Sequence, residues 1–263
     1  MEVSISTVAT EAPELEFTGE RIVPGLVMDS LFREHQDRYV FAGDFVKGKM
    51  VLDVACGTGI GTQYLLDAGA QACIGFDLEE DALAYARREY PQCTFVRCDA
   101  GRLPLGDSTI DVVVSFETIE HLSDPRSFVM HCSHVLKPGG LFICSTPNRA
   151  VYRWYGRNEF HQREFFPAEF VDLLNAHFSV LGVYSQAEKT YPIFLVERAA
   201  VGLLAFLRLK EPIRKVFRGN HDSLSSATRF RANEDGLATK VKKFTPSRIR
   251  RPTYVLAVAR KAL

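Results

Sequence analysis

The hydrophobic residues between positions 50 and 146 form short runs, which are separated by longer stretches of mixed polarity. The runs stand at 51–54, 73–77, 94–99, 110–116 and, around a Pro-Gly-Gly turn, within 136–143. Each run has the length of a buried strand, and the stretches between them have the mixed pattern of helices that cover a sheet. This alternation predicts an α/β domain whose parallel sheet is covered by helices on both faces.

The pattern changes on both sides of this region. Before it, apolar and polar residues predict a helix over 31–46. After it, the segment 147–166 is rich in arginine and aromatic residues. A helix is then predicted over 167–176, with a proline in its first turn, where proline is favoured. Strands are predicted at 178–185 and, just before the end, at 253–259.

About 65 residues separate these last two predicted strands, which is far longer than a typical connection. We therefore expect an inserted cap over 186–251, which would also carry substrate-binding residues. The core would consist of 17–185 together with 252–263. Residues 1–16 are small, polar and acidic without periodicity, which predicts a disordered tail.

The first run ends in a glycine-rich turn with the sequence VLDVACGTGIG, residues 51–61. Glycines let the backbone approach a ligand closely and adopt positive φ without steric cost. Asp53 stands four residues before Gly57, where it can meet the ammonium group of a ligand. This spacing favours an amino-acid-bearing nucleotide over the pyrophosphate of a dinucleotide. The stretch resembles motif I of the class I, Rossmann-like S-adenosylmethionine-dependent methyltransferases.

Four further landmarks follow in the order of that family, over about 100 residues. The second and third runs end in Asp77 and Asp99, the fourth leads into 117–122, and 136–143 resembles the family's helix end, turn and fifth strand. The resemblance implies a doubly wound, seven-stranded, mostly parallel sheet of order 3-2-1-4-5-7-6, with strand 7 antiparallel. It points to the small-molecule and glycan-associated type, which includes the ubiquinone and menaquinone biosynthesis methyltransferases.

The resemblance also implies S-adenosyl-L-methionine as the cofactor and a set of residues that hold it. The cofactor-binding residues implied are Arg38, Tyr39, Asp53, Ala55, Gly57, Gly59, Asp77, Leu78, Asp99, Ala100 and Phe116. Asp77 would bind the ribose hydroxyls, and its alternative is a surface acid at a strand end. Ordinary helix packing is the alternative for Tyr39, and a surface position is the alternative for Arg38. Ala55 stands where the family commonly has the first glycine of motif I.

The acceptor side would be formed by the segments after the fourth and fifth strands. His121 and His161 are the candidate catalytic residues, because an imidazole with a pKa near neutrality can act as a general base. A structural role through a backbone or carboxylate bond is the alternative for each. The predicted substrate-binding residues are Glu117, Asn148, Tyr152, Trp154 and Phe160.

Charge and cysteine content narrow the function further. The formal net charge is zero, so no global attraction to nucleic acid is expected. Six cysteines occur without a CxxC pair, and neither a zinc-like His/Cys spacing nor an acidic triad is readable, so no metal site is predicted. Such cysteines suit a reducing, cytoplasmic location. The most apolar run, 199–207, is too short to span a bilayer, although peripheral membrane contact stays open.

Together these features predict a methyltransferase acting on a small-molecule, sugar or lipid-linked acceptor, most readily at oxygen because two histidines can take a hydroxyl proton. Nitrogen and carbon acceptors stay open. The Asn-Pro-Pro-Tyr-type signature of nucleic-acid amino methyltransferases is absent after the fourth strand, which argues against base methylation. Two other classes are a non-catalytic cofactor-binding module and a nicotinamide-dependent oxidoreductase, although the latter requires a GxGxxG spacing that 57–62 does not have.

Overall fold

The computed structural model describes residues 29–152, 158–190, 241–244 and 250–263. The predicted tail at 1–16 and most of the predicted cap at 186–251 lie outside the described residues, as does Trp154.

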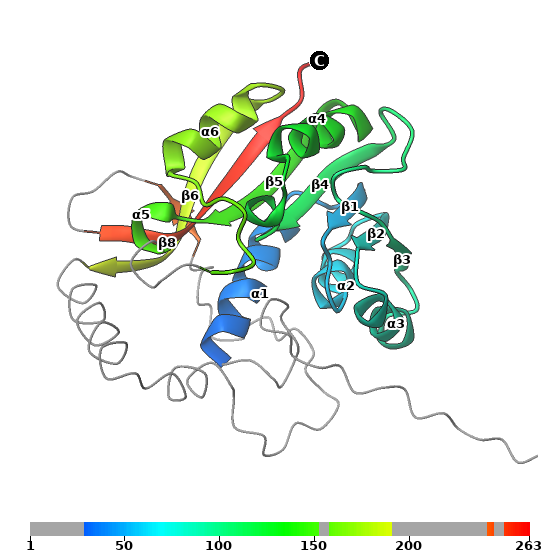
Figure 1. The fold of residues 1–263 in the computed structure, drawn as a ribbon. Helices are drawn as coiled ribbons and strands as arrows, with labels where there is room; N and C mark the ends of the chain where they lie inside the picture. The colour runs from blue at the N-terminus through cyan, green and yellow to red at the C-terminus, as the bar shows by residue number, and fades with distance from the viewer. Residues whose placement is uncertain (1–28, 153–157, 191–240, 245–249) are drawn as a thin grey trace, which may run out of the picture.

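The described strands form one mixed sheet (Figure 1). They are β1 (Met50–Val54), β2 (Ala72–Asp77), β3 (Thr94–Arg97), β4 (Ile110–Phe116), β5 (Leu136–Pro147), β6 (Ser179–Thr190), β7 (Lys242–Lys243) and β8 (Arg250–Arg260). Their order is β3-β2-β1-β4-β5-β8-β6-β7. The first five pair in parallel, whereas β8 lies antiparallel between β5 and β6. With β8 counted as the seventh strand, the predicted order 3-2-1-4-5-7-6 is confirmed, and the two-residue β7 extends one edge.

Helices cover both faces of the sheet, as the alternation of runs predicts (Figure 1). They are α1 (Asp29–Gly43), α2 (Ile60–Asp67), α3 (Glu80–Glu89), the 3₁₀ helix η1 (Ile119–His121), α4 (Pro125–Val135), α5 (Arg149–Tyr152) and α6 (Pro167–Asn175). Figure 1 places α1, α2 and α3 on one side of the sheet, and α4 and α6 on the other.

Two hydrophobic clusters, one on each face, hold these layers together. In β4, Val112 and Val114 belong to the cluster under α1, α2 and α3, whereas Val113 belongs to the cluster under α4 and α6. Successive side chains of a strand point to opposite faces, so a strand covered on both faces is apolar at every position. The continuous run 112–114 is therefore the sequence of a central strand, and the central strands place their carboxyl ends at one edge of the sheet.

The last strand pair is longer than its apolar pattern. β6 continues to Thr190 and β8 begins at Arg250, and the register pairs Lys189 with Arg251. The prediction of 178–185 ended too early and that of 253–259 began too late, because the polar residues at these ends are held by backbone pairing. The first helix was also misplaced by a few residues, since α1 spans Asp29–Gly43 instead of 31–46.

Candidate cofactor and acceptor site

The turn between β1 and α2 has the left-handed backbone that its glycines permit. Ala55, Gly57 and Gly59 have φ values of 62°, 55° and 77°. A methyl group on Gly59 would lie 2.7 Å from both the Ala86 side chain and the Phe95 ring, so packing also requires glycine there. A methyl group on Gly57 would meet no atom within 4 Å among the described residues. The surrounding protein thus leaves no room for a side chain at Gly59, whereas the described residues leave space beside Gly57.

Asp53 lies beneath this turn and is fully buried. Tyr39 donates its hydroxyl to the two carboxylate oxygens at 3.1 and 3.2 Å, and Thr62 donates to Oδ2 at 2.6 Å. Burial raises the pKa of Asp53 to about 7, against the lowering effect of these hydrogen bonds. Asp53 therefore anchors α1 and α2 to the end of β1. The predicted contact with the ammonium group of the cofactor stays a prediction.

Tyr39 has both a packing role and a place at the site. It is buried, and its ring lies edge-to-face with Phe116 at a centroid distance of 5.0 Å. Any side chain at Gly61 would overlap the Tyr39 ring. Tyr39 therefore fixes the position of α1 over the carboxyl ends of β1 and β4, where Phe116 is the last residue of its strand.

Two further predicted cofactor acids stand at neighbouring strand ends. Asp77 accepts hydrogen bonds from the backbone N–H groups of Gly57 at 2.7 Å and Glu79 at 2.9 Å. Asp99 accepts one from Gly101 at 2.8 Å. Leu78 is 54% exposed although it is apolar, and Ala100 is half-buried. Since β2 and β3 are adjacent and parallel, this edge carries two acids and an exposed apolar side chain, the groups expected for a ribose and an adenine.

Arg38 is 2% exposed, so the surface alternative for this residue is wrong. Its Nη1 donates to Gln186 Oε1 at 2.9 Å, and its guanidinium lies 4.6 Å from the ring centroid of Tyr254. Its Nε has no hydrogen-bond partner among the described residues. Arg38 precedes Tyr39 in α1 and contacts Tyr254, whose hydroxyl accepts from Tyr152, so it lies between the cofactor side and the acceptor side.

The segment after β4 carries two carboxylates, of which Glu117 is half-buried and Glu120 is fully buried. Glu117 has a left-handed backbone with φ 52°, a strained conformation for a residue with a side chain, and it accepts from Ser145 Oγ at 2.6 Å. Glu120 is fully buried, and its Oε2 accepts from Thr146 Oγ1 at 3.0 Å. Its Oε1 has no hydrogen-bond partner among the described residues. Burial raises the pKa of both carboxyls, and the charge of Glu117 raises the pKa of Glu120 further.

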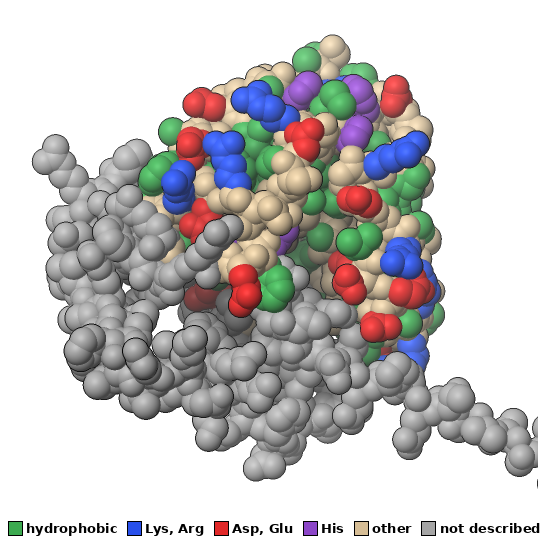
Figure 2. All heavy atoms as spheres, viewed as in Figure 1, with side chains coloured by type: hydrophobic (Ala, Val, Ile, Leu, Met, Phe, Trp, Pro, Cys, Tyr) green, Lys and Arg blue, Asp and Glu red, His purple; other side chains and the backbone are tan. Residues whose placement is uncertain are grey.

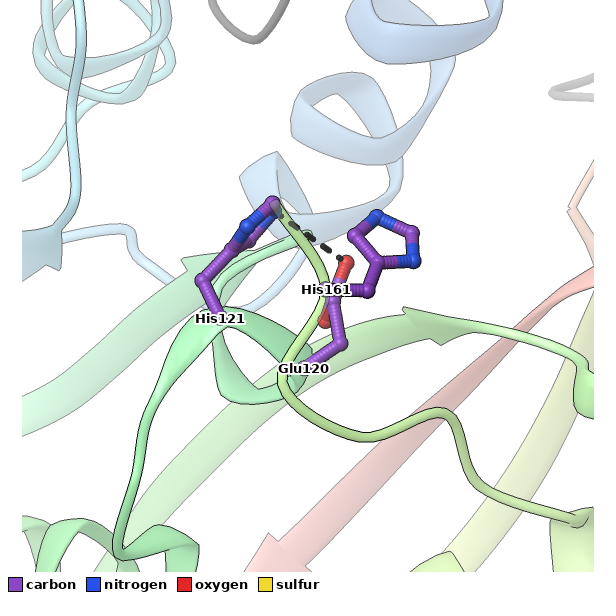
Figure 3. A group of neighbouring side chains, drawn as sticks. All are labelled: Glu120, His121 and His161. Atoms are coloured by element: carbon purple, nitrogen blue, oxygen red, sulfur yellow. Dashed lines mark ion pairs between the residues drawn. The ribbon is translucent and has the colours of Figure 1, made fainter. Parts of the chain in front are cut away.

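The structure brings the two predicted catalytic histidines together, with ring centroids 4.8 Å apart and ring planes at 83°. Backbone N–H groups of Gln162 and Arg163 donate to the Glu120 carbonyl at 2.9 and 3.1 Å, which fixes the loop carrying His161 against η1. Figure 3 shows His121 and His161 on either side of Glu120. Burial and the charge of His121 lower the pKa of His161 to about 4.

Glu120 was missed from the sequence, although it lies within the segment that drew attention to His121. One ligand atom from each of Glu120, His121 and His161 forms a group in which all atoms lie within 4.8 Å of one another. The sequence predicted no metal site, and this group was not identified from it. His161 is distant in sequence from the other two residues, and its position depends on the loop contacts with η1.

The other predicted acceptor residues have different surroundings. The Asn148 amide is buried and occupied by the fold, since it donates to the Pro252 carbonyl at 2.9 Å and accepts from the Ala150 N–H at 3.0 Å. Tyr152 donates to the Tyr254 hydroxyl at 3.0 Å. Phe160 is 41% exposed, and its carbonyl accepts from His121 Nδ1 at 3.1 Å. Phe160 therefore lies beside the histidine pair, and so does Tyr152, whose ring centroid is 6.1 Å from that of His161. Asn148 instead has a structural partner for each end of its amide.

The sheet order, the glycine turn and the acids at successive strand ends define the class of a Rossmann-like, S-adenosylmethionine-dependent methyltransferase. A family model described as "Methyltransferase domain" matches residues 52–144. A protein of Mycolicibacterium smegmatis, named as a probable S-adenosylmethionine-dependent methyltransferase, is 41% identical over 181 residues, which cover 66% of this chain and 70% of that relative. The chain belongs to this methyltransferase family, and S-adenosyl-L-methionine is its cofactor.

More distant relatives agree with this assignment. A probable S-adenosylmethionine-dependent methyltransferase of Mycobacterium tuberculosis is 39% identical over 61% of this chain and 60% of its own length. A ubiquinone biosynthesis O-methyltransferase of Idiomarina loihiensis is 38% identical over 42% of this chain and 47% of its own length. The nicotinamide alternative is thereby set aside, as the missing GxGxxG spacing indicates.

Solved structures share the fold at low sequence identity. A SAM-dependent methyltransferase structure from Thermotoga maritima superposes with a TM-score of 0.58 at 17% identity, covering 88% of this chain and 92% of that one. A TehB-like SAM-dependent methyltransferase from Corynebacterium glutamicum gives a TM-score of 0.52 at 15% identity, with 86% of each chain covered. At these identities the likeness supports the fold alone.

Three further features concern the surface charge, the cysteines and the membrane. On the face shown in Figure 2, Lys and Arg side chains are interspersed with Asp and Glu, without a large patch of one sign on the described residues. All six cysteines are buried and free. Within the described ranges, no helix is both long enough and apolar enough to cross a membrane.

Proposed function

We propose that the enzyme transfers the methyl group of S-adenosylmethionine to a hydroxyl oxygen of its acceptor. The acceptor is a small molecule, a sugar or a lipid-linked compound. The observation that carries this proposal is the pair of imidazoles beside the carboxyl end of β4, with centroids 4.8 Å apart. A hydroxyl acceptor must lose a proton when it is methylated, and this pair is the group of side chains best suited to that task.

The cofactor supplies a methyl group that is already activated on a sulfonium. The chain must therefore bind the cofactor, align the acceptor and deal with the proton. Asp77 and Asp99 would hold the ribose and the adenine, and the open side of Gly57 would admit the methionine end. Phe116 would lie beside the sulfonium, because it ends the strand that adjoins β1. Proximity and alignment alone can supply much of the reduction of the barrier.

The acceptor would lie on the far side of Phe116, against the segment after β4. His121 and His161 would act on its hydroxyl proton, while Tyr152 and Phe160 would contact its apolar parts. The name of the Idiomarina relative, an O-methyltransferase, supports an oxygen acceptor. Buried free cysteines support a cytoplasmic location.

The test is methyl transfer from isotope-labelled S-adenosylmethionine into a cellular metabolite extract, followed by mass spectrometry and NMR of each labelled product. We expect a methyl ether, the product of methylation at a hydroxyl oxygen. An N-methyl or C-methyl product would contradict the oxygen assignment while leaving the methyltransferase intact. Asp77→Ala, in which cofactor binding should be weakened, serves as the control. A product that is labelled equally by the unaltered chain and by Asp77→Ala is not made at this site.

A further inference from the structure

We propose that Glu120, His121 and His161 bind a divalent transition-metal ion, and that this ion holds the hydroxyl oxygen of the acceptor. The inference rests on the proposed function for the acceptor, but the metal site itself stands on the geometry of these side chains.

The three side chains converge on one point although they come from two segments. Their candidate ligand atoms all lie within 4.8 Å of one another, and His121 Nε2 is 3.9 Å from Glu120 Oε1 (Figure 3). Nitrogen and oxygen ligands lie about 2.0–2.2 Å from such ions, so neighbouring ligands of a tetrahedral or octahedral ion are about 3.0–3.5 Å apart. Side-chain movements that together close the longest separation by roughly 1.5 Å would therefore complete the site.

Glu120 Oε1 has no hydrogen-bond partner among the described residues, which favours a bound cation beside it. The side chain is 0% exposed, Thr146 holds Oε2, and Oε1 has no hydrogen-bond partner among the described residues. A buried carboxylate oxygen without a partner is costly, and buried charges are normally paired or bound to metal. A divalent ion between Glu120 and the two imidazoles would satisfy this oxygen directly.

Both histidines have the outer hydrogen bonds that are typical of metal ligands. His121 Nδ1 donates to the Phe160 carbonyl at 3.1 Å, because a carbonyl can only accept. His161 Nδ1 faces the Glu164 carboxylate at 3.3 Å. In each neutral ring the lone pair is then on Nε2, the nitrogen that would bind the ion. Asn158 Nδ2 lies 2.9 Å from His161 Nε2 and would turn away when the ion binds.

The donor set selects the kind of ion. Two imidazoles and one carboxylate suit Zn²⁺, Mn²⁺, Fe²⁺ or Co²⁺, whereas Mg²⁺ prefers oxygen ligands. Three protein ligands leave at least one coordination position for a substrate oxygen. As ligands, the two histidines act on the hydroxyl proton through the ion instead of accepting it themselves. The ion lowers the pKa of the bound hydroxyl, the proton leaves to water, the oxygen forms a bond to the methyl carbon, and the methyl–sulfur bond breaks with its electron pair kept by sulfur.

The experiment measures metal binding by the full-length chain without cofactor or acceptor. After chelator treatment and buffer exchange, Co²⁺ is titrated by calorimetry and by visible absorption, and Zn²⁺ and Mg²⁺ are compared. We expect one Co²⁺ per chain, with ligand-field bands, and weaker binding of Mg²⁺. Glu120→Gln and His161→Ala should each lower the affinity for Co²⁺ by at least about 100-fold, and Glu164→Gln by about 10- to 100-fold.

The matched control is His134→Ala, which removes an exposed histidine from α4 and should leave Co²⁺ binding unchanged. S-adenosylmethionine affinity and the melting temperature verify that each variant is folded. The proposal is overturned if the unaltered chain binds no Co²⁺ at about millimolar concentration, or if Glu120→Gln and His161→Ala bind it as the unaltered chain does. Methyl transfer without metal binding would refute this inference alone, and metal binding without methyl transfer to oxygen would refute the proposed function alone.

Discussion

The cofactor side and the acceptor side of the site satisfy their buried polar groups in different ways. On the cofactor side, Asp53 and Asp77 use both carboxylate oxygens in hydrogen bonds to the protein. On the acceptor side, Glu120 Oε1 is buried without a hydrogen-bond partner among the described residues, and so is Arg38 Nε between the two sides. The cofactor side is thus organised in advance, whereas the acceptor side has polar groups that a ligand can complete.

This comparison predicts that changes on the two sides separate turnover from cofactor binding. The largest effect is expected for the histidine pair. Replacing His121 or His161 by Ala should lower turnover by roughly 10²- to 10⁴-fold, because the hydroxyl proton or the ion that holds the hydroxyl loses its partner. Affinity for S-adenosylmethionine should stay within about twofold, since both residues lie on the acceptor side.

Steady-state kinetics at saturating acceptor, with cofactor affinity from calorimetry, check this expectation. His134→Ala is again the control. Normal turnover of the double variant His121→Ala/His161→Ala would show that alignment by itself carries the reaction and that the acceptor side needs no polar partner.

Asp53 sharpens the comparison through pH. Burial raises its pKa to about 7 in the folded chain, from 3.8 in the unfolded chain. Between these values the folded state binds more protons than the unfolded state, so this group lowers the free energy of unfolding as pH rises from about 4 to about 7. The full loss is on the order of 4 kcal/mol by linkage, and above pH 7 the contribution of Asp53 is constant.

Denaturant unfolding of the cofactor-free chain and of Asp53→Asn, at several pH values between 5 and 8, isolates this effect. The difference in stability between the two chains should grow in favour of Asp53→Asn up to about pH 7 and then level off. A difference that is independent of pH would mean that the hydrogen bonds from Tyr39 and Thr62 keep Asp53 ionised.

The next effect is the loss of an acid at the edge of the cofactor side. Asp77→Ala should weaken S-adenosylmethionine binding by about 1.5–3 kcal/mol, the range for hydrogen bonds to a charged group. Turnover at saturating cofactor should change much less. Calorimetry measures the affinity, and Asp67→Ala, an exposed acid at the end of α2, is the control. Equal affinity of Asp77→Ala and the unaltered chain would remove Asp77 from the ribose site.

The sequence predicts the cofactor side better than the acceptor side, for a physical reason. The turn after β1 and the acids at Asp77 and Asp99 are local features, because each follows its strand directly. The contact between Glu120 and His161 depends instead on backbone bonds from Gln162 and Arg163 to the Glu120 carbonyl, which no spacing reveals. Sheet order followed from the family resemblance, whereas the ends of β6 and β8 did not, since polar residues there are paired through the backbone.

Asn148 illustrates the same limit. Its place in an aromatic, arginine-rich segment predicted a substrate contact, yet its amide bonds Pro252 and Ala150 in the structure. The partner at Pro252 is 104 residues away, so the bond could not be foreseen from the neighbourhood in sequence.

The smallest predicted effect concerns backbone strain in the turn on the cofactor side. Ala55 has φ 62° and an exposed side chain, so it bears the cost of a left-handed conformation without gaining packing. That cost is about 1–2 kcal/mol, whereas glycine costs about 0.4–1 kcal/mol through the entropy of the unfolded chain. Ala55→Gly should therefore stabilise the chain by up to about 1.5 kcal/mol. Ala84, exposed within α3, is the matched control, and Ala84→Gly should destabilise by about 0.5–1 kcal/mol. If the change in unfolding free energy has opposite signs for Ala55→Gly and Ala84→Gly, Ala55 is strained. Changes of the same sign would contradict this. Cofactor affinity should stay unchanged in both variants, because the turn already has the conformation that glycine adopts freely.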